Sequence, residues 1–245
     1  MPALSANSVL RIWEDGLEQP PLERALTILR HSVRSSAVDP ADLTLPERDR
    51  QLFEARDALF GQRLPGYASC PHCTEPLEFD LMLEELSMPV PPVLETDVAF
   101  EGGSLLVRLP TSRDLAVCTS EHVSNARETE LLARCIVSTS DLPSEAASAE
   151  ARRALAARAR AQICDAWDAL APGMHTELRL HCLRCEHSFS QDFDIATFLW
   201  TEVSMLARRL LREVAELAHA YKWRESDILA MSARRRHAYL ELVGS

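Results

Sequence analysis

Two Cys-x-x-Cys pairs constrain this chain of 245 residues more than any other feature. Cys70 and Cys73 form the first pair, and Cys182 and Cys185 form the second, with a long segment between them. Apolar and polar residues alternate over 77–81 and again beside the second pair, which is the pattern of β-strands. A Cys-x-x-Cys at the tip of a hairpin is a zinc knuckle, and two knuckles supply the four thiolates of one tetrahedral site. The sequence therefore predicts one structural Zn²⁺ bound by these four cysteines.

Two alternatives to a joint metal site remain open. The thiols could lie apart and never meet, or one pair could be a redox-active dithiol. The redox alternative is disfavoured because a thioredoxin-like pair lies near a βαβ pattern, and neither pair has that context. Three histidines near the pairs could replace a thiolate but are expected to be bystanders: His72, His181 and His187. The remaining cysteines lie in helical patterns and are expected to be small core residues: Cys118, Cys135 and Cys164.

The hydrophobic periodicity predicts an α+β protein that is mainly α-helical. Its small antiparallel β region would resemble a zinc ribbon, formed by two knuckles distant in sequence, with a helical insertion between them and flanking helices. The predicted segments are an N-terminal helical segment (1–64), the first zinc knuckle with β-hairpins (65–110), the helical insertion (111–170), the second knuckle hairpin (171–196), and a long C-terminal helix with a helical hairpin (197–245).

Caps and breaks predict individual elements within these segments. Asp194 is expected to cap the longest helix, which runs to about Tyr221 with apolar residues at spacings of three and four. Within the insertion, the pattern predicts a helix over 127–137, a loop over 138–148 and one long helix over 149–170.

The composition, with 47% hydrophobic and 26% charged residues, is that of an ordinary globular protein. No run of about 18 apolar residues occurs, and the N-terminus lacks the charged-then-apolar layout of a secretory signal. We therefore predict no membrane span and synthesis in the cytoplasm, where thiols stay reduced and available to a metal.

The formal net charge of −11 argues against general nucleic-acid binding, because nucleic acids attract basic surfaces. The charge is also uneven along the chain. Residues 40–101 hold thirteen acidic residues against four arginines, whereas 205–245 hold eight lysines and arginines against five acidic residues. This distribution favours an assembly component with two docking faces over a free enzyme.

Motifs of catalytic sites are missing from the sequence. It contains no Gly-x-Ser-x-Gly, no His-Glu-x-x-His and no glycine-rich phosphate loop, and only seven glycines occur in all. A zinc ion held by four cysteines has no open position for water, unlike a catalytic zinc. We therefore predict a protein that is not an enzyme and has no small-molecule substrate.

Aromatic and basic residues gather near the C-terminus. Aromatic side chains beside arginine are typical of protein–protein hot spots. The candidate partner-binding residues are Tyr221, Trp223, Arg234, Arg235, Arg236 and Tyr239. Equally, the aromatic residues could pack the C-terminal hairpin onto its own long helix. The arginines could form a solvated face or, after a turn, contact nucleic acid.

Several of these stretches together resemble a known family. The C-terminal part contains Phe198-Leu199-Trp200, Leu210-Leu211-Arg212-Glu213-Val214, Ala220-Tyr221-Lys222-Trp223, Asp227-Ile228-Leu229-Ala230-Met231, Arg234-Arg235-Arg236 and Tyr239-Leu240. Near the N-terminus stand Trp13-Glu14-x-Gly16 and Gln19-Pro20-Pro21-Leu22. With the two Cys-x-x-Cys pairs, these residues resemble the zinc-knuckle members of the T-even-type baseplate proteins, or baseplate hub assembly chaperones, of contractile phage tails and phage-tail-like injection systems. The insertion at 111–170 carries little of the resemblance. The residue after each pair, often glycine in the family, is Thr74 or Glu186 here.

The resemblance implies a structural or assembly role at the baseplate, near the hub and spike, without catalysis. It implies other baseplate, hub, spike or tail-tube proteins as partners. It also implies synthesis in the bacterial cytoplasm and a final place in a phage tail baseplate or an injection-system particle. The alternative function, from a different class, is a zinc-ribbon adaptor that binds nucleic acid.

Overall fold

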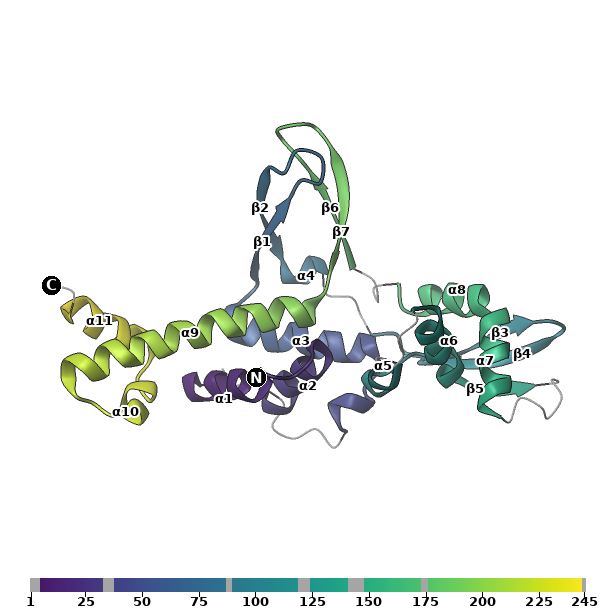
Figure 1. Ribbon diagram of the computed structural model, residues 1–245, viewed down its shortest axis with the longest axis horizontal. Coiled ribbons are helices and arrows are strands. Elements are labelled where there is room, and N and C mark those ends of the chain that lie inside the picture. The colour runs from purple at the N-terminus through teal and green to yellow at the C-terminus, as the bar shows by residue number, and fades with distance from the viewer. Residues whose placement is uncertain are drawn as a thin grey trace. The chain divides into compact units, whose positions relative to one another are not determined.

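The structure, a computed structural model, describes residues 5–32, 38–86, 90–118, 124–140, 148–172 and 176–243 (Figure 1). It is a mixture of helices and small antiparallel sheets, with helices in the majority. The chain divides into two compact units. The first unit comprises Met1–Ser35, Glu54–Gly61 and Asp194–Ser245, and the second comprises Ser36–Phe53 and Gln62–Phe193. In the part of the chain described, none of the helices has both the length and the apolar character that a membrane crossing requires.

The first unit is built from helices around the long helix α9. Its elements are α1 (Ala6–Gly16), α2 (Pro21–Ser32), the end of α3 (Leu45–Phe60), α9 (Ile195–Tyr221), α10 (Glu225–Leu229) and α11 (Ala233–Val243). α9 contacts α1, α2, α10 and α11. The predicted cap is confirmed, because the Asp194 carboxylate accepts hydrogen bonds from the backbone N–H groups of Ala196 and Thr197. At the other end Lys222 adopts a left-handed conformation (φ 58°) and closes the helix after Tyr221.

A buried ion pair joins α3 to α9 inside this unit. Arg56 is 1% exposed, and its guanidinium donates to both carboxylate oxygens of Glu202 at 3.0 and 2.9 Å. Nearby, Gly16 of α1 lies directly against the indole of Trp200. Any side chain at Gly16 would overlap this ring, so that glycine permits the close approach of α1 to α9.

The second unit combines a three-stranded sheet with two separate hairpins. Its elements are η1 (Pro40–Asp42), the start of α3, β1 (Arg63–Ser69), β2 (Pro76–Met82), α4 (Leu83–Leu86), β3 (Glu95–Phe100), β4 (Gly103–Arg108), α5 (Ser112–Cys118), α6 (Ser124–Cys135), β5 (Ile136–Ser140), α7 (Ala149–Arg158), α8 (Arg160–Leu170), β6 (Thr176–His181) and β7 (Ser188–Phe193). β3, β4 and β5 form the antiparallel sheet, whereas β1 pairs with β2 and β6 pairs with β7.

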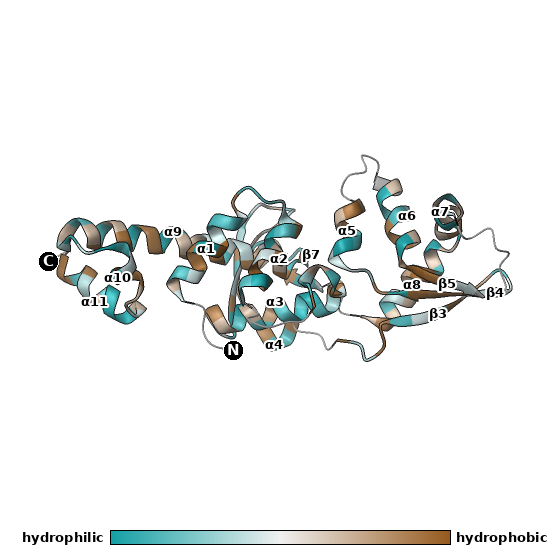
Figure 2. Cartoon of the chain, turned by 90° about the horizontal axis from the view of Figure 1, so that it is seen from below, coloured by the Kyte–Doolittle hydropathy of each residue, from teal (hydrophilic) through white to brown (hydrophobic). Residues whose placement is uncertain are grey.

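The apolar core of the second unit lies between the three-stranded sheet and helices α6, α7 and α8. Figure 2 shows hydrophobic residues gathered in the strands of this sheet. Leu105 and Val107 of β4 are fully buried and pack with Leu132 of α6 and Ile163 of α8. Trp167 belongs to the same core, and its indole N–H donates to the backbone carbonyl of Arg108 at 3.1 Å.

The helix expected over 127–137 is confirmed as α6, although it ends at Cys135. The loop expected from residue 138 is wrong at its start, because the chain continues there as β5. The β-branched residues of 136–139 favour this extended strand, which completes the sheet beside β4. The rest of that expected loop, 141–147, lies outside the described residues.

The prediction of a single helix over 149–170 is wrong. The segment forms two helices, α7 and α8, separated at Ala159, whose backbone is not helical (φ −90°, ψ 9°). Ala159 is fully buried between Leu155 and Ile163, which belong to the same core. The break therefore lets both helices turn apolar residues toward one core, an arrangement that a straight helix does not provide.

Candidate metal centre

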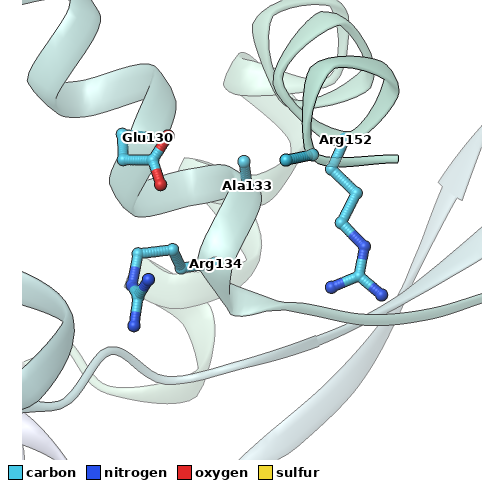
Figure 3. Close-up of a pocket in the computed structure, with 5 residues that line it drawn as sticks. Glu130, Ala133, Arg134 and Arg152 are labelled. Atoms are coloured by element: carbon cyan, nitrogen blue, oxygen red, sulfur yellow. The ribbon is translucent and has the colours of Figure 1, made fainter. Parts of the chain in front are cut away.

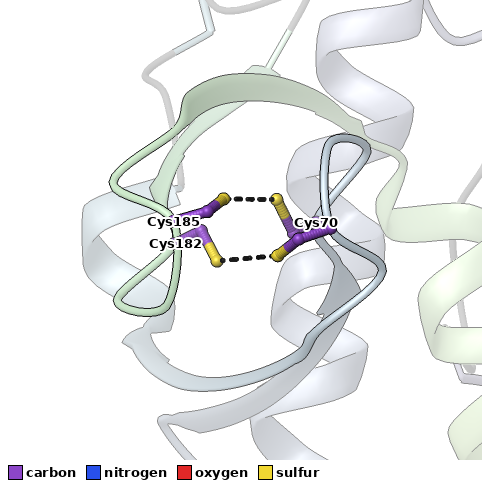
Figure 4. Close-up of side chains that lie close together, drawn as sticks. Cys70, Cys182 and Cys185 are labelled. Atoms are coloured by element: carbon purple, nitrogen blue, oxygen red, sulfur yellow. Dashed lines mark hydrogen bonds between the residues drawn. The ribbon is translucent and has the colours of Figure 1, made fainter.

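The tips of the two hairpins bring the four cysteines of the Cys-x-x-Cys pairs together (Figure 4). The Sγ atoms of Cys70 and Cys185 are 3.6 Å apart, and those of Cys73 and Cys182 are also 3.6 Å apart. All four sulfur atoms lie within 4.8 Å of one another. A tetrahedral site with metal–sulfur bonds of about 2.3 Å has sulfur–sulfur edges of about 3.8 Å. The predicted convergence of the four cysteines is confirmed, and their spacing fits a metal ion.

None of the seven cysteines is in a disulfide. A disulfide brings two sulfur atoms to about 2.05 Å, well inside the separation found here. Cys118 and Cys135 are buried and Cys164 is half-buried, all in helices of the second unit. Burial raises the pKa of the Cys135 thiol to about 12, so that this residue is a small apolar core side chain, as expected.

The two knuckles have the same backbone hydrogen bonds, each 2.9 Å long: Cys70 N–H to Glu75 C=O, Thr74 N–H to Cys70 C=O, Cys182 N–H to His187 C=O and Glu186 N–H to Cys182 C=O. In both, the first cysteine is fully buried and the second is half-buried. The two halves are therefore equivalent, with each buried cysteine facing the half-buried cysteine of the other knuckle.

Thr74 and Glu186 occupy the same position in the two turns and have positive φ angles of 58° and 60°. This left-handed conformation favours glycine and costs other residues roughly 1–2 kcal/mol. Glycine would adopt this turn without strain. At the first knuckle the Thr74 hydroxyl donates to the Cys73 carbonyl at 2.7 Å, which offsets part of the strain.

The thiols have opposing pKa shifts. Backbone N–H groups of Cys185 and Arg184 lower the pKa of Cys182 to about 7. The N–H of His187 favours the thiolate of Cys185, but desolvation and the other thiols outweigh it and raise the pKa of Cys185 to about 12. Four negative sulfur atoms at this spacing repel one another, so that all four can ionise together only around a cation.

Side chains beside the cysteines also connect the two knuckles. Arg184 forms an ion pair with Glu75 across the gap between them. The His72 and His187 rings lie 5.5 Å apart, and His187 stacks on Phe189 at 6.3 Å. Within the described residues, the cluster whose donor atoms could together hold a metal contains only the four cysteines. His72, His181 and His187 are not members of this cluster.

The C-terminal aromatic residues also come together. The rings of Tyr221 and Trp223 stack at 4.5 Å, and Tyr239 packs edge-on against Trp223 at 4.8 Å. All three side chains are half-buried, so that they pack α11 against the end of α9 and keep one side toward solvent. The Arg235 guanidinium lies 5.8 Å from the Tyr239 ring centre.

The three consecutive arginines have different surroundings. Arg234 and Arg235 are exposed, whereas Arg236 is 5% exposed. Its guanidinium donates to Glu213 of α9 at 2.9 Å and to the Met231 carbonyl at 2.7 Å. Arg236 therefore fixes α11 on α9, and the surface that a partner could contact keeps only Arg234 and Arg235 of the run.

A buried charge network that we did not predict lies at the start of α5. The Asp114 carboxylate is 2% exposed and accepts from Arg108 at 2.7 Å, Arg134 at 3.1 Å and the Thr111 N–H at 3.0 Å. Burial alone would raise its pKa, but these hydrogen bonds outweigh it and lower the pKa to about 2. The spacing Thr111-x-x-Asp114 is that of a capping box and could have indicated the bonds between these two residues. It could not have indicated Arg108 and Arg134, which come from other elements.

A cavity of about 320 Å³ opens beside α6 and α7 (Figure 3). It is lined by Glu130, Ala133, Arg134, Ala149 and Arg152. Glu130 is paired with Arg153, and Arg134 with Asp114.

Comparison with models of protein families, with curated proteins and with solved structures gives no significant match to this chain.

Proposed function

We propose that this chain is a non-enzymatic structural component or assembly factor of the baseplate of a contractile phage tail or injection system, with a structural Zn²⁺ in the four-cysteine cluster. The observation that carries the proposal is the meeting of two equivalent knuckles whose cysteines Cys73 and Cys182 are 109 residues apart in sequence. A metal ion bound by all four cysteines would join the two hairpins and would have no free position for a reacting molecule.

The donor set favours zinc over other metals. Four thiolates are soft ligands in tetrahedral positions, which is the coordination of structural zinc sites. With all four positions filled by sulfur, the metal has no site for water and contributes to folding rather than to catalysis. The two hairpins also need such a link, because an isolated two-stranded hairpin is marginally stable in water. In this proposal the hairpins together form a zinc ribbon split by the insertion.

The baseplate role is supported by the sequence resemblance, which is strongest in the C-terminal helices. In the proposal, the half-buried aromatic cluster and the exposed Arg234 and Arg235 contact a hub, spike or tail-tube protein. The protein is then made in the bacterial cytoplasm and acts on the assembling particle. Nucleic-acid binding at the knuckles is less well supported, because Arg184 there is paired with Glu75.

The metal is tested by elemental mass spectrometry of the purified protein and of the variant Cys70→Ser/Cys182→Ser. We expect about one zinc per chain in the wild type and none in the double variant. Cys164→Ser is the matched control, because this cysteine lies outside the cluster and should leave the zinc content unchanged. Wild-type protein free of metal would exclude the four-thiolate site.

The baseplate role is tested by co-expression with the hub, spike and tail-tube proteins of one particle. We expect the wild type to co-purify with one of them, and Trp223→Ala to lose this partner while keeping its zinc. Absence of any complex, together with tight salt-dependent binding to DNA, would instead support the nucleic-acid adaptor.

A further inference from the structure

A groove runs between the two hairpins, along strands β2 and β6. It has a volume of about 610 Å³ and is lined on one side by 75–79 and on the other by 179–184. Consecutive residues of both strands line it, although alternate side chains of a strand point to opposite faces. The groove therefore follows the edges of the two strands rather than one face of either hairpin.

These two edges are unpaired within the described part of the chain. There β2 pairs only with β1, and β6 pairs only with β7. An unpaired edge presents backbone N–H and C=O groups that another strand can satisfy. The groove thus has an open β-edge on each of its two sides.

The register of the first hairpin shows which groups face the groove. Residue pairs in an antiparallel ladder alternate between hydrogen-bonded and non-hydrogen-bonded. Because Cys70 N–H bonds to the Glu75 carbonyl, the pairs Ser69–Pro76, Tyr67–Glu78 and Pro65–Asp80 are non-hydrogen-bonded. Both prolines in the strands of this hairpin, Pro65 and Pro76, fall in these pairs, where no N–H is needed between the strands. The backbone N–H and C=O of Glu78 consequently point away from β1, at the free edge of β2.

The second hairpin follows the same rule. Cys182 N–H bonds to the His187 carbonyl, so that the pairs formed by Arg179 and His181 with β7 are non-hydrogen-bonded. Their backbone groups point away from β7, at the free edge of β6. Glu78, Arg179 and His181 all line the groove.

The side chains that line the groove are a mixture of apolar residues and charged residues whose charges balance. Leu77, Phe79 and Leu180 are half-buried and line it. Glu75 and Arg184 neutralise each other at the knuckle end. Of the other lining residues, Glu78 on one strand and Arg179 on the other carry opposite charges. A polyanion would meet as much repulsion as attraction here, whereas an uncharged segment with alternating apolar residues matches both the charge balance and the apolar side chains.

We propose that this groove binds an extended segment of a partner protein as an added β-strand. The segment carries few charges and has apolar residues at alternate positions, which contact Leu77, Phe79 and Leu180. Its backbone bonds to the free edges at Glu78 and Arg179. Five residues of strand span roughly 16 Å, which sets the length of the contact. This inference does not depend on the identity of the metal or on the baseplate role.

The probes for the test are three fluorescein-labelled octapeptides in which threonine alternates with valine, leucine or phenylalanine. Binding to the full-length, metal-loaded protein is measured by fluorescence anisotropy. We expect saturable binding of at least one peptide. The same peptide with N-methyl groups on alternate backbone nitrogens should bind about tenfold more weakly, since it loses hydrogen bonds to a strand edge.

Variants of the protein test the same bonds from the other side. Glu78→Pro removes the N–H at the free edge of β2, at a position where the pairing with β1 uses none; Glu78→Ala is the matched control that keeps it. We expect Glu78→Pro and Arg179→Pro to weaken peptide binding about tenfold and the alanine variants to stay close to wild type. If a proline variant fails to fold, the N-methylated peptide still decides the question.

The proposal would be overturned if none of the three peptides bound saturably, or if the N-methylated peptide bound as tightly as the unmodified one. Displacement of the bound peptide by a single-stranded oligonucleotide would also overturn it. So would a wild-type dimer that Glu78→Pro dissociates. The last result would assign the groove to a second copy of this chain.

Discussion

The Sγ atoms of Cys73 and Cys182 lie 3.6 Å apart, although 109 residues separate the two cysteines in the sequence. The same distance joins Cys70 and Cys185. Each of these two close pairs of sulfur atoms therefore joins a cysteine of the first knuckle to a cysteine of the second. A metal ion bound by these sulfur atoms would hold two short hairpins together that share no strand pairing with each other within the described residues.

Chelation of the metal is expected to expose the hairpins and leave the three-stranded sheet intact. The hairpins depend on the cysteine cluster, whereas β3, β4 and β5 have an apolar core of their own. Amide hydrogen exchange before and after treatment with a chelator measures both regions in one experiment. We expect exchange in β1, β2, β6 and β7 to approach that of an unfolded chain. Unchanged protection there would show that the hairpins do not need the metal.

Glu186→Gly is expected to stabilise the protein by about 1 kcal/mol, because Glu186 has a positive φ that glycine adopts without strain. Thr74→Gly should give a smaller gain, since it also removes the hydroxyl bond to the Cys73 carbonyl. Urea denaturation of the metal-loaded protein measures both. As a control, Ser190→Gly lies in extended β7 and should destabilise by roughly 0.5–1 kcal/mol. Equal effects at all three positions would contradict the strain argument.

Asp114→Asn is expected to lower the free energy of unfolding by about 3 kcal/mol, because it leaves the Arg108 and Arg134 guanidinium groups without their carboxylate. Chemical denaturation measures the change. Asp168→Asn, at an exposed position of α8, is the control and should stay within about 0.5 kcal/mol of wild type.

The same carboxylate predicts a pH dependence of stability. The pKa of Asp114 falls from 3.8 to about 2 on folding, so that the folded state favours its ionised form. Its contribution is complete above the unfolded value and is lost as the pH falls through about 2. Wild type should therefore lose more stability between pH 5 and pH 2 than Asp114→Asn does. Identical pH profiles for the two proteins would exclude this carboxylate as a source of the dependence.

Arg236→Ala is expected to release α11 from α9 and to destabilise the C-terminal hairpin by about 2 kcal/mol, because its bonds to Glu213 and the Met231 carbonyl are lost. The exposed Arg234→Ala is the matched control and should change stability by less than about 0.5 kcal/mol. Hydrogen exchange of the α11 amides measures the effect. If both variants expose α11 equally, the burial of Arg236 is not what holds the hairpin.

The features that the sequence predicts well are those with a local physical cause. The Asp194 cap and the long apolar stripe of α9 are properties of a single segment, and both are confirmed. The meeting of the four cysteines could also be predicted, because two unpaired knuckles each lack half of a ligand set. The metal that they hold and the partners of the protein stay predictions.

The features that were missed depend on contacts distant in sequence. β5 follows directly on α6 without a breaking residue, and its β-branched residues become a strand through pairing with β4, which is distant in sequence. Ala159 is a good helix former, and its break comes from the shared core on either side. Arg234, Arg235 and Arg236 are alike in sequence, but a turn of about 100° per residue points only the third at Glu213.

The separation of the two knuckles also sets an order of events during synthesis. A ribosome adding about 5–20 residues per second takes roughly 5–20 seconds to go from Cys73 to Cys182. During that interval the first pair of thiols emerges from the ribosome before the second pair has been made. All the residues that form the core of the three-stranded sheet and its helices precede Cys182 in the sequence, so that this core can form first. If the cluster binds a metal as proposed, metal loading is therefore a late step, and newly made chains would be most sensitive to oxidants and to metal shortage before the second knuckle emerges.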